Sequence, residues 1–225
     1  LDAVKVFHEN GITTIAKGAQ DPYSVWGTMG LLCRFGYFDK IDDILAGDEK
    51  FDNPDFVKFY EKLDELREAG AFPSNVSTST YYDAKEMFMS GQAAMFDSGT
   101  WDCAYFEGGD YKDDIKFSWG VSFSDGVGDQ NVSMQVPHVP LCISAKVAED
   151  PAKEEAILDF FKFYYSDEGA KIMIDNLCTP PTNYSGEIEE SFLSEHPVFA
   201  SVIDAMNQDT VSPEMQPDNV STEAF

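Results

Sequence analysis

Residues 88–101 decide how this sequence is expected to fold: Phe88-Met89-Ser90-Gly91-Gln92-Ala93-Ala94-Met95-Phe96-Asp97-Ser98-Gly99-Thr100-Trp101. The stretch before Gly91 predicts a helix, capped at its start by Ser79 or Thr80, that ends at this glycine. Ala93–Phe96 is a short apolar run and predicts a strand. Gly99 is expected to let the backbone turn sharply into a second helix that contains Trp101.

The rest of the chain continues this alternation of helices with short strands. The clearest helix is Pro54 to Ala69, because Asn53 suits the N-cap and Gly70 the C′ position. Alternation of apolar with small or polar residues predicts strands at Phe117–Phe123 and Val139–Ser144. A strand at Ile12–Ala16 and further helices complete the pattern, the helices at Leu1–Asn10, Pro22–Leu32, Ile41–Leu45, Asp150–Tyr164, Ser166–Asn176 and His196–Met206. The fold class is therefore α/β.

The composition is that of a folded, strongly acidic protein. The 225 residues include 15 Lys+Arg and 41 Asp+Glu, which gives a formal net charge of −26. With 43% hydrophobic and 14% aromatic residues, the chain is too apolar to be a disordered acidic segment. The charge repels nucleic acid and anionic lipid, so neither is an expected direct partner. The sequence contains no apolar run of about 18 residues, so no membrane span is predicted.

Sequence motifs for catalysis, cofactors or metals are absent. His8, His138 and His196 stand alone, without carboxylates or cysteines at metal-ligand spacing. The sequence has no nucleophile elbow, no phosphate-binding loop and no dinucleotide-binding fingerprint. No enzyme activity, no cofactor and no metal are therefore predicted.

Two weaker patterns leave alternatives open. Asp125, Asp129 and Asn131 loosely suggest a calcium loop but lack its order of ligands, and a solvated loop is the alternative. The cysteines are far apart and form no CxxC pair, so they are expected to be small buried side chains: Cys33, Cys103, Cys142 and Cys178.

Three aromatic residues stand where open α/β sheets bind ligands. Tyr23 and Trp26 lie at a helix start just after the first strand, and Trp101 lies at another just after Ala93–Phe96. Their rings offer flat apolar faces for stacking, while Asp side chains and free helix N–H groups bind hydroxyls. The alternative, from spacing alone, is that all three are core residues.

The order of these motifs resembles that of the extracellular solute-binding proteins of ABC-type sugar importers, the maltose-binding-protein-like family. Residues 88–101 look like the family signature F-x-x-G-x-A-A-M-x-x-x-G-x-W. Other stretches are similar to further family elements in the same order: Gly11–Ala16, Asp21–Trp26, Glu65–Gly70, Ile143–Lys146 and Ala156–Gly169. The collinear order of these elements carries the resemblance.

The resemblance implies a periplasmic-binding-protein-like, two-lobed fold, of which this sequence holds mostly the second lobe and part of the first. It assigns residues 1–136 to the second (C-terminal) lobe, 137–210 to the first lobe and 211–225 to a return into the second. The opening part of the first lobe is then expected to lie outside this sequence. The lobes of such a protein close on a ligand between them and deliver it to a membrane permease.

The resemblance also implies which residues bind the ligand. The family's stacking tryptophan corresponds to Trp101, with Asp97 and Ser98 as polar partners. The remaining candidates belong to the acidic-Pro-aromatic element, to its helix, or to the end of the sequence: Asp21, Pro22, Tyr23, Trp26 and Phe225. Trp119 and His138 lie near predicted strand ends and are weaker candidates.

The sequence therefore predicts a non-enzymatic, carbohydrate-binding component of an ABC transporter, located at the extracellular face of the cell membrane or in the periplasm. Its expected partners are a small-molecule carbohydrate and the ABC permease subunits. The membrane is expected as a partner only through a lipid anchor outside this sequence. Two alternatives stay open, namely the same fold binding a non-sugar solute and an extracellular glycoside hydrolase domain.

Overall fold

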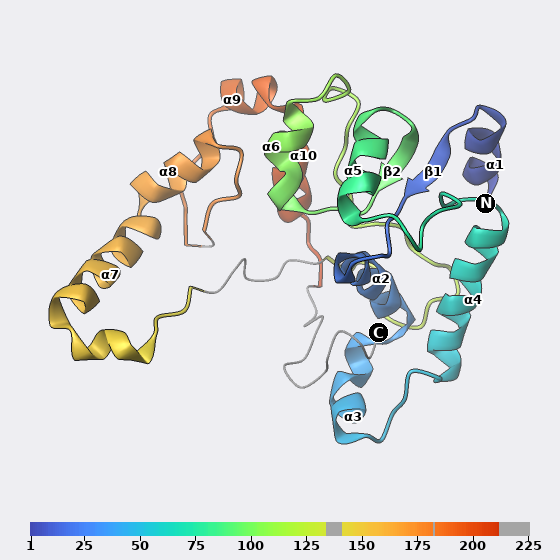
Figure 1. The fold of residues 1–225 in the computed structure, drawn as a ribbon, viewed down its shortest axis with the longest axis horizontal. Coiled ribbons are helices and arrows are strands. Elements are labelled where there is room, and N and C mark those ends of the chain that lie inside the picture. The colour runs from blue at the N-terminus through green and yellow to red at the C-terminus, as the bar shows by residue number, and fades with distance from the viewer. Residues whose placement is uncertain (134–140, 182, 212–225) are drawn as a thin grey trace. The chain divides into compact units, whose positions relative to one another are not determined.

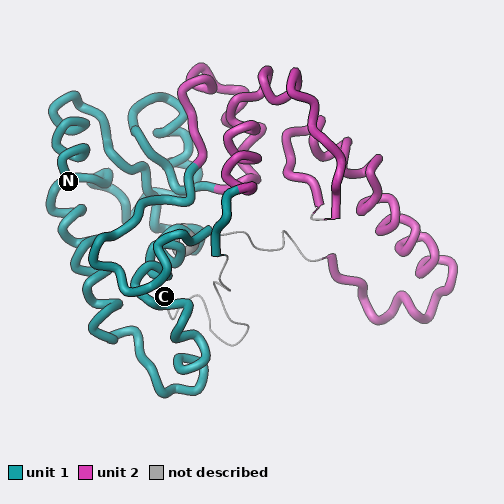
Figure 2. The backbone as a smooth tube through the Cα atoms, turned by 180° about the vertical axis from the view of Figure 1, so that it is seen from behind, with its two compact units in different colours: residues 1–98, 118–136, 208–225 teal, residues 99–117, 137–207 magenta. Residues whose placement is uncertain are grey.

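The computed structural model describes residues 1–133, 141–181 and 183–211, without the side chains of residues 24–26. Two compact units divide the chain, and Figure 2 colours them separately. Unit 1 consists of Leu1–Ser98, Ser118–Val136 and Gln208–Phe225, and unit 2 of Gly99–Phe117 and Pro137–Asn207. The lobe boundaries predicted from the sequence refer to a complete two-lobed fold and stay a prediction.

Unit 1 contains a parallel pair of strands, β1 (Thr13–Ala16) and β2 (Ala93–Phe96). Both strands are labelled in Figure 1. Thr13 pairs with Ala93 and Ala16 with Phe96. The predicted strands at these positions are confirmed. α1 (Asp2–Glu9) precedes β1, and α5 (Tyr81–Met89) precedes β2 and packs on it through a small core of alanines: Ala16, Ala84 and Ala93. Small side chains let the helix approach the sheet closely.

A second, aromatic core fills the other part of unit 1. The elements around it are α2 (Val25–Leu32), α3 (Ile41–Ala46), α4 (Pro54–Glu68) and short 3₁₀ helices at Pro22–Ser24, Cys33–Phe35 and Phe38–Lys40. Phe35, Phe56 and Phe59 are fully buried in this core, as is Tyr37. Burying each such ring is worth about 1.5–3 kcal/mol, so this cluster anchors the unit.

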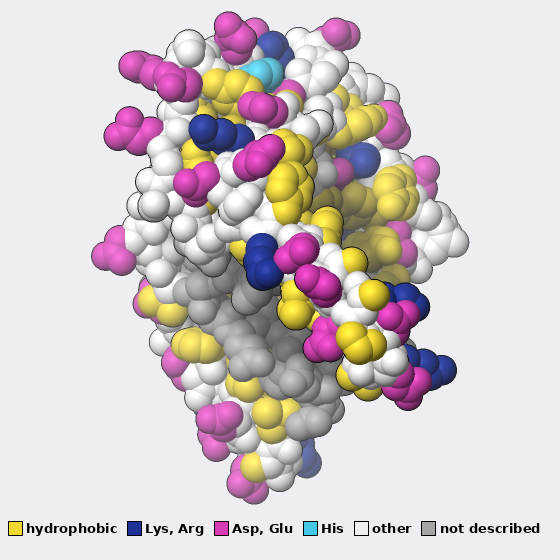
Figure 3. All heavy atoms as spheres, turned by 90° about the vertical axis from the view of Figure 1, so that its left-hand side faces the viewer, with side chains coloured by type: hydrophobic (Ala, Val, Ile, Leu, Met, Phe, Trp, Pro, Cys, Tyr) yellow, Lys and Arg dark blue, Asp and Glu magenta, His cyan; other side chains and the backbone are white. Residues whose placement is uncertain are grey.

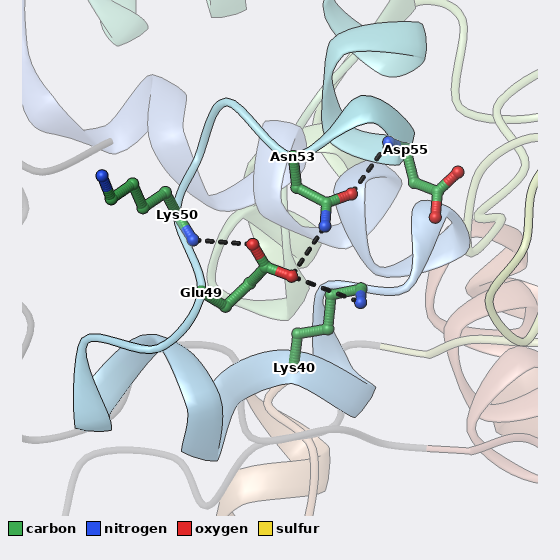
Figure 4. Close-up of polar contacts among 5 residues, drawn as sticks. All are labelled: Lys40, Glu49, Lys50, Asn53 and Asp55. Atoms are coloured by element: carbon green, nitrogen blue, oxygen red, sulfur yellow. Dashed lines mark hydrogen bonds and ion pairs between the residues drawn. The ribbon is translucent and has the colours of Figure 1, made fainter.

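The start of α4 shows how local sequence fixes a helix boundary (Figure 4). Asn53 Oδ1 accepts a hydrogen bond from the N–H of Asp55 at 2.9 Å, as predicted for the N-cap. The Asn53 amide in turn donates to Glu49, which also accepts from the N–H of Lys50 at 2.8 Å and from the Lys40 ammonium at 3.5 Å. The hydrogen bond from Lys50 is the main reason that the pKa of Glu49 is lowered.

The predicted strand at Phe117–Phe123 is wrong. The carbonyl of Trp119 accepts a hydrogen bond from the buried guanidinium of Arg34 at 2.7 Å, and the N–H of Phe123 donates to Gln130 Oε1 at 2.8 Å. Side chains rather than a neighbouring strand thus satisfy this backbone. Further along, Val132 forms a single parallel bridge with Val211.

The regular secondary structure in the described residues of unit 2 is helical. Its helices are the 3₁₀ turn Thr100–Asp102, α6 (Cys103–Glu107), the 3₁₀ turn Ala145–Glu149, α7 (Pro151–Tyr164), α8 (Asp167–Asp175), α9 (Glu190–Glu195) and α10 (Pro197–Met206). α6 packs on α10, where Phe106 and Phe199 are buried. The predicted strand Val139–Ser144 is wrong for residues 141–144, which are irregular, and Val139 and Pro140 lie outside the described residues.

Apolar side chains remain exposed on unit 2. α7, which confirms the helix predicted at Asp150–Tyr164, has no fully buried residue, and its Phe160 and Phe163 are exposed. Figure 3, seen from the α7 side of Figure 1, shows hydrophobic side chains lying among acidic ones. Among the described residues, none of the helices combines the length and apolarity needed to cross a membrane.

Candidate functional site

The carboxyl ends of β1 and β2 lie at one edge of the sheet, because the strands are parallel. The segment after β1 reaches the start of α5, where the N–H of Gln20 donates to the carbonyl of Ser79 at 3.0 Å. Gly18 lies so close to the carbonyl of Thr80 that a β carbon there would overlap it. Three segments far apart in sequence therefore meet at this edge, and we name their polar and aromatic residues the carboxyl-edge cluster: Lys17, Asp21, Tyr23, Tyr81, Asp97 and Ser98.

The Asp21 carboxylate organises one side of the carboxyl-edge cluster. One oxygen accepts from the N–H of Tyr81 at 2.7 Å, and the other accepts from the N–H of Tyr23 at 3.2 Å. Tyr81 is the first residue of α5, so this carboxylate lies at the positive end of a helix.

The other side of the carboxyl-edge cluster comes from the residues after β2. Asp97 Oδ2 forms an ion pair with Lys17 Nζ at 2.6 Å, and its carboxylate lies against Gly27 in α2, where a β carbon would overlap it. Ser98 Oγ lies 2.8 Å from Tyr81 Oη. A side chain at position 27 would thus have to displace the Asp97 carboxylate.

The aromatic rings of the carboxyl-edge cluster face partly into solvent. Tyr23 is 54% exposed, and its ring meets that of Tyr81 edge to face, with centroids 6.0 Å apart. A buried hydrophobic role is therefore excluded for Tyr23. Trp26 belongs to α2, but its side chain is outside the described part of the structure.

Trp101 belongs to unit 2 and lies in the 3₁₀ turn after Gly99. Its side chain is 60% exposed, unlike that of a core residue. The expectation of a sharp turn at Gly99 is wrong, since φ −144° and ψ −175° are an extended conformation open to any residue. The glycine matters for another reason: the six-membered ring of the Trp101 indole occupies the space of a β carbon at position 99.

The structure thus brings together four of the predicted site residues, Asp21, Tyr23, Asp97 and Ser98, in unit 1. Phe225 and His138 lie outside the described residues, and Trp119 contributes its carbonyl to Arg34. Sequence reasoning missed Lys17 and Tyr81. Tyr81 is an aromatic residue at a capped helix start, the same signal that singled out Tyr23, but it precedes a strand instead of following one.

The described residues contain no group of three His, Cys, Asp or Glu side chains that could hold a metal ion. In the loosely calcium-like loop, Asp125 pairs with Lys62 at 2.9 Å and Asp129 accepts from the N–H of Asn131. A hollow of about 190 Å³ beside α7 has a mainly aliphatic lining without aromatic rings for stacking, which includes Ile143, Val147 and Ile157.

Two of the four cysteines are buried, and the prediction that all four are buried is wrong. Cys33 and Cys103 are buried, whereas Cys142 and Cys178 are exposed. Burial raises the pKa of the Cys33 and Cys103 thiols to about 12, so both stay protonated and unreactive at neutral pH.

The solved structures that share this fold include the following two. One is a chitin oligosaccharide binding protein, with a TM-score of 0.68 and 20% identity over 91% of this chain and 50% of that one. The other comes from work on xylan utilization by the thermophilic bacterium Caldanaerobius polysaccharolyticus, with a TM-score of 0.68 and 24% identity over 96% of this chain and 55% of that one. The chain therefore spans about half the length of these structures, and its predicted periplasmic-binding-protein-like fold is confirmed. No curated protein sequence matches it.

The family comparison extends over most of the chain. The sequence model of the bacterial extracellular solute-binding proteins matches residues 1–192. This match confirms the predicted resemblance and the predicted extracellular location. The chain belongs to the family of bacterial extracellular solute-binding proteins.

Proposed function

We propose that this protein binds a carbohydrate outside the cytoplasm and delivers it to the permease of an ABC transporter. The observation that carries the proposal is the carboxyl-edge cluster, in which the Asp21 carboxylate is fixed by two backbone N–H groups beside the exposed ring of Tyr23. A sugar presents hydroxyls around its edge and C–H groups on its faces. A fixed carboxylate accepts hydrogen bonds from the hydroxyls, and an exposed aromatic ring beside it packs on the C–H groups.

Each part of the carboxyl-edge cluster has a chemical role in this proposal. Asp21 accepts hydroxyl hydrogen bonds, which a charged acceptor strengthens. Tyr23 stacks on the apolar face of a sugar ring. The ion pair neutralises Lys17 and Asp97, so neither presents an isolated charge to a neutral sugar. Ser98 and Tyr81 offer further hydroxyls.

Trp101 provides the second stacking surface in the proposal. It is exposed and follows β2 by a few residues, on the segment that leaves unit 1 for unit 2. The lobes, assigned as residues 1–136 and 211–225 against 137–210, close on the ligand and exclude water from both contacts. The chitin oligosaccharide binding protein shares the fold and supports a sugar as the ligand.

A ligand screen tests the proposal. The full-length protein that carries this chain is melted in the presence of neutral mono- and oligosaccharides. A bound sugar at 100 times its Kd adds about 2.7 kcal/mol to the free energy of unfolding, which is a clear rise in Tm. Uptake of the same sugar by cells with and without the gene then tests delivery to a permease.

The two alternatives give different results in the same samples. A cationic or amphiphilic solute that raises Tm where no sugar does indicates the fold with a non-sugar ligand, which the net charge of −26 also favours. New reducing ends after incubation with oligosaccharides indicate a glycoside hydrolase. Either result contradicts the proposed function.

A further inference from the structure

Three tyrosines lie next to one another. Tyr81 and Tyr82 are the first two residues of α5, and Tyr23 contacts Tyr81. The ring of Tyr81 meets that of Tyr23 at a centroid distance of 6.0 Å and an interplanar angle of 71°. The ring of Tyr81 also meets that of Tyr82, at a centroid distance of 5.7 Å and an interplanar angle of 89°. Tyr23 and Tyr82 are 54% and 61% exposed, whereas Tyr81 is half-buried. We name Tyr23, Tyr81 and Tyr82 the tyrosine platform.

The central ring of the tyrosine platform is held from several directions. The backbone N–H of Tyr81 donates to Asp21 at 2.7 Å, and its hydroxyl lies 2.8 Å from Ser98 Oγ. The ring also packs against Phe96 of β2 with centroids 5.1 Å apart. Tyr81 therefore joins the segments after β1 and β2 and fixes the position from which the outer rings extend.

The outer ring of Tyr82 is also restrained although it is exposed. Lys85, one turn along α5, places its ammonium 5.2 Å from the Tyr82 ring centroid. The helix start itself is fixed by a capping box between Thr80 and Asp83. An exposed ring that is already restrained loses little conformational entropy when a ligand stacks on it.

The tyrosine platform is larger than one sugar ring needs. A single pyranose covers about one aromatic ring, and Asp21 with Tyr23 already provides a ring and a charged acceptor for it. Tyr82 is a further exposed ring, separated from Tyr23 by the anchored Tyr81. The carboxylates next to the platform, Asp21 and Asp83, disfavour an acidic sugar.

We infer that the ligand is a neutral oligosaccharide of at least two sugar units, and that Tyr82 stacks on a unit beyond the one bound at Asp21 and Tyr23. This inference rests on the proposed function, because it requires that the carboxyl-edge cluster binds sugar. Tyr82 is in this view the residue that determines the preferred length of the ligand. Tyr81 is a positioning residue that holds the platform together.

The test measures affinity against ligand length. Titration calorimetry on the full-length protein uses xylose, N-acetylglucosamine and glucose together with their linear oligosaccharides of two to six units. For the preferred sugar, affinity is expected to rise at least tenfold from monomer to oligomer. Tyr82→Ala is expected to lower oligomer affinity by about 5- to 150-fold, the range for one lost stacking contact, and to leave monomer affinity within twofold.

Conservative and matched variants separate stacking from other effects. Tyr82→Phe keeps the ring and is expected to retain the length preference. Tyr111→Ala removes another exposed tyrosine, from unit 2, and is expected to leave both the monomer affinity and the oligomer affinity unchanged. Tyr81→Phe and Ser98→Ala each remove the same hydroxyl contact, so the loss of affinity in the double variant is expected to be smaller than the sum of the losses in the two single variants.

The outcomes distinguish this inference from the proposed function. A protein that binds the monomer as tightly as its oligomers, or a Tyr82→Ala variant that weakens both equally, overturns the length-determining role while sugar binding stands. A protein that binds no sugar of any length overturns the proposed function and the tyrosine platform with it.

Discussion

The indole of Trp101 lies directly over the α carbon of Gly99, in the space that a β carbon would fill. The backbone of Gly99 is extended, so an alanine there costs no backbone strain. The side chain at position 99 therefore controls where the indole lies, independently of how the chain turns. This relationship connects a single glycine to the proposed stacking residue.

Gly99→Ala is expected to displace the indole and weaken sugar binding by about 1–3 kcal/mol, the value of a lost stacking contact. Stability is expected to be unchanged or slightly higher, because alanine restricts the unfolded chain. Calorimetry and melting of the full-length protein measure the two effects. Gly108→Ala is the matched control, since a β carbon there meets only ordinary contacts. Unchanged affinity in Gly99→Ala would show that the position of the indole does not matter.

Trp101→Ala is expected to lower sugar affinity by roughly 1–3 kcal/mol with little loss of stability. The reason is that the side chain is 60% exposed, whereas removing a core tryptophan costs about 3–5 kcal/mol of stability. Trp101→Phe keeps a smaller ring and is expected to restore part of the affinity. A variant that binds sugar normally but melts far earlier than the wild type contradicts the assignment of Trp101 to the site.

Local signals in the sequence predicted the elements that hold the site. Asn53 caps α4 as expected, and Thr80 caps α5, one of the two residues predicted for that cap, because a cap depends on a few neighbouring residues. The short β-branched run of β1 and the short apolar run of β2 were also enough to predict both strands. These elements place Asp21 and Tyr23 at the carboxyl edge of the sheet, as the sequence predicted.

Long-range contacts account for what the sequence did not predict. The segment at Phe117–Phe123 has strand-like alternation. However, the guanidinium of Arg34, 85 positions earlier, donates a hydrogen bond to the carbonyl of Trp119. Tyr81 joins the carboxyl-edge cluster through Asp21, 60 positions earlier, and no local pattern marks such a bond.

The cap of α5 makes the carboxyl-edge cluster sensitive to acid. The pKa of Asp83 is lowered, first by the hydrogen bond from the N–H of Thr80 and then by the Thr80 hydroxyl. The stabilisation from Asp83 is therefore complete above the unfolded-state pKa of about 3.9 and is lost as the pH falls through the lower folded-state value. Acid is expected to loosen the start of α5, where Tyr81 and Tyr82 lie.

Asp83→Asn tests this dependence. Its free energy of unfolding is expected to lie below that of the wild type at pH 7 and to approach it as the pH falls below about 4. Denaturant unfolding of the full-length protein across this pH range measures the difference. Asp48→Asn, at an exposed carboxylate before α4, is the control. If the difference in free energy of unfolding between the wild type and Asp83→Asn stays constant with pH, the charge of Asp83 has no role in the cap.

Glu107 links the two packed helices of unit 2. From the end of α6, its Oε1 accepts a hydrogen bond at 2.9 Å from the N–H of Phe199, the third residue of α10. The N–H groups in the first turn of a helix have no partner within the helix, and Phe199 is fully buried, so water does not replace this acceptor. The carboxylate of Glu107 therefore caps α10 from a neighbouring helix.

Glu107→Ala is expected to cost about 1–3 kcal/mol of stability, the penalty for leaving a buried N–H without an acceptor. Glu107→Gln keeps an acceptor oxygen and is expected to lose less, which separates the hydrogen bond from the charge. Glu195→Ala, at an exposed glutamate in α9, is the control. Denaturant unfolding gives the stability, and hydrogen exchange at the Phe199 amide reports the bond itself. If this amide exchanges equally slowly in the wild type and in Glu107→Ala, the carboxylate is not the cap, and the stability of α10 comes from its apolar contacts with α6.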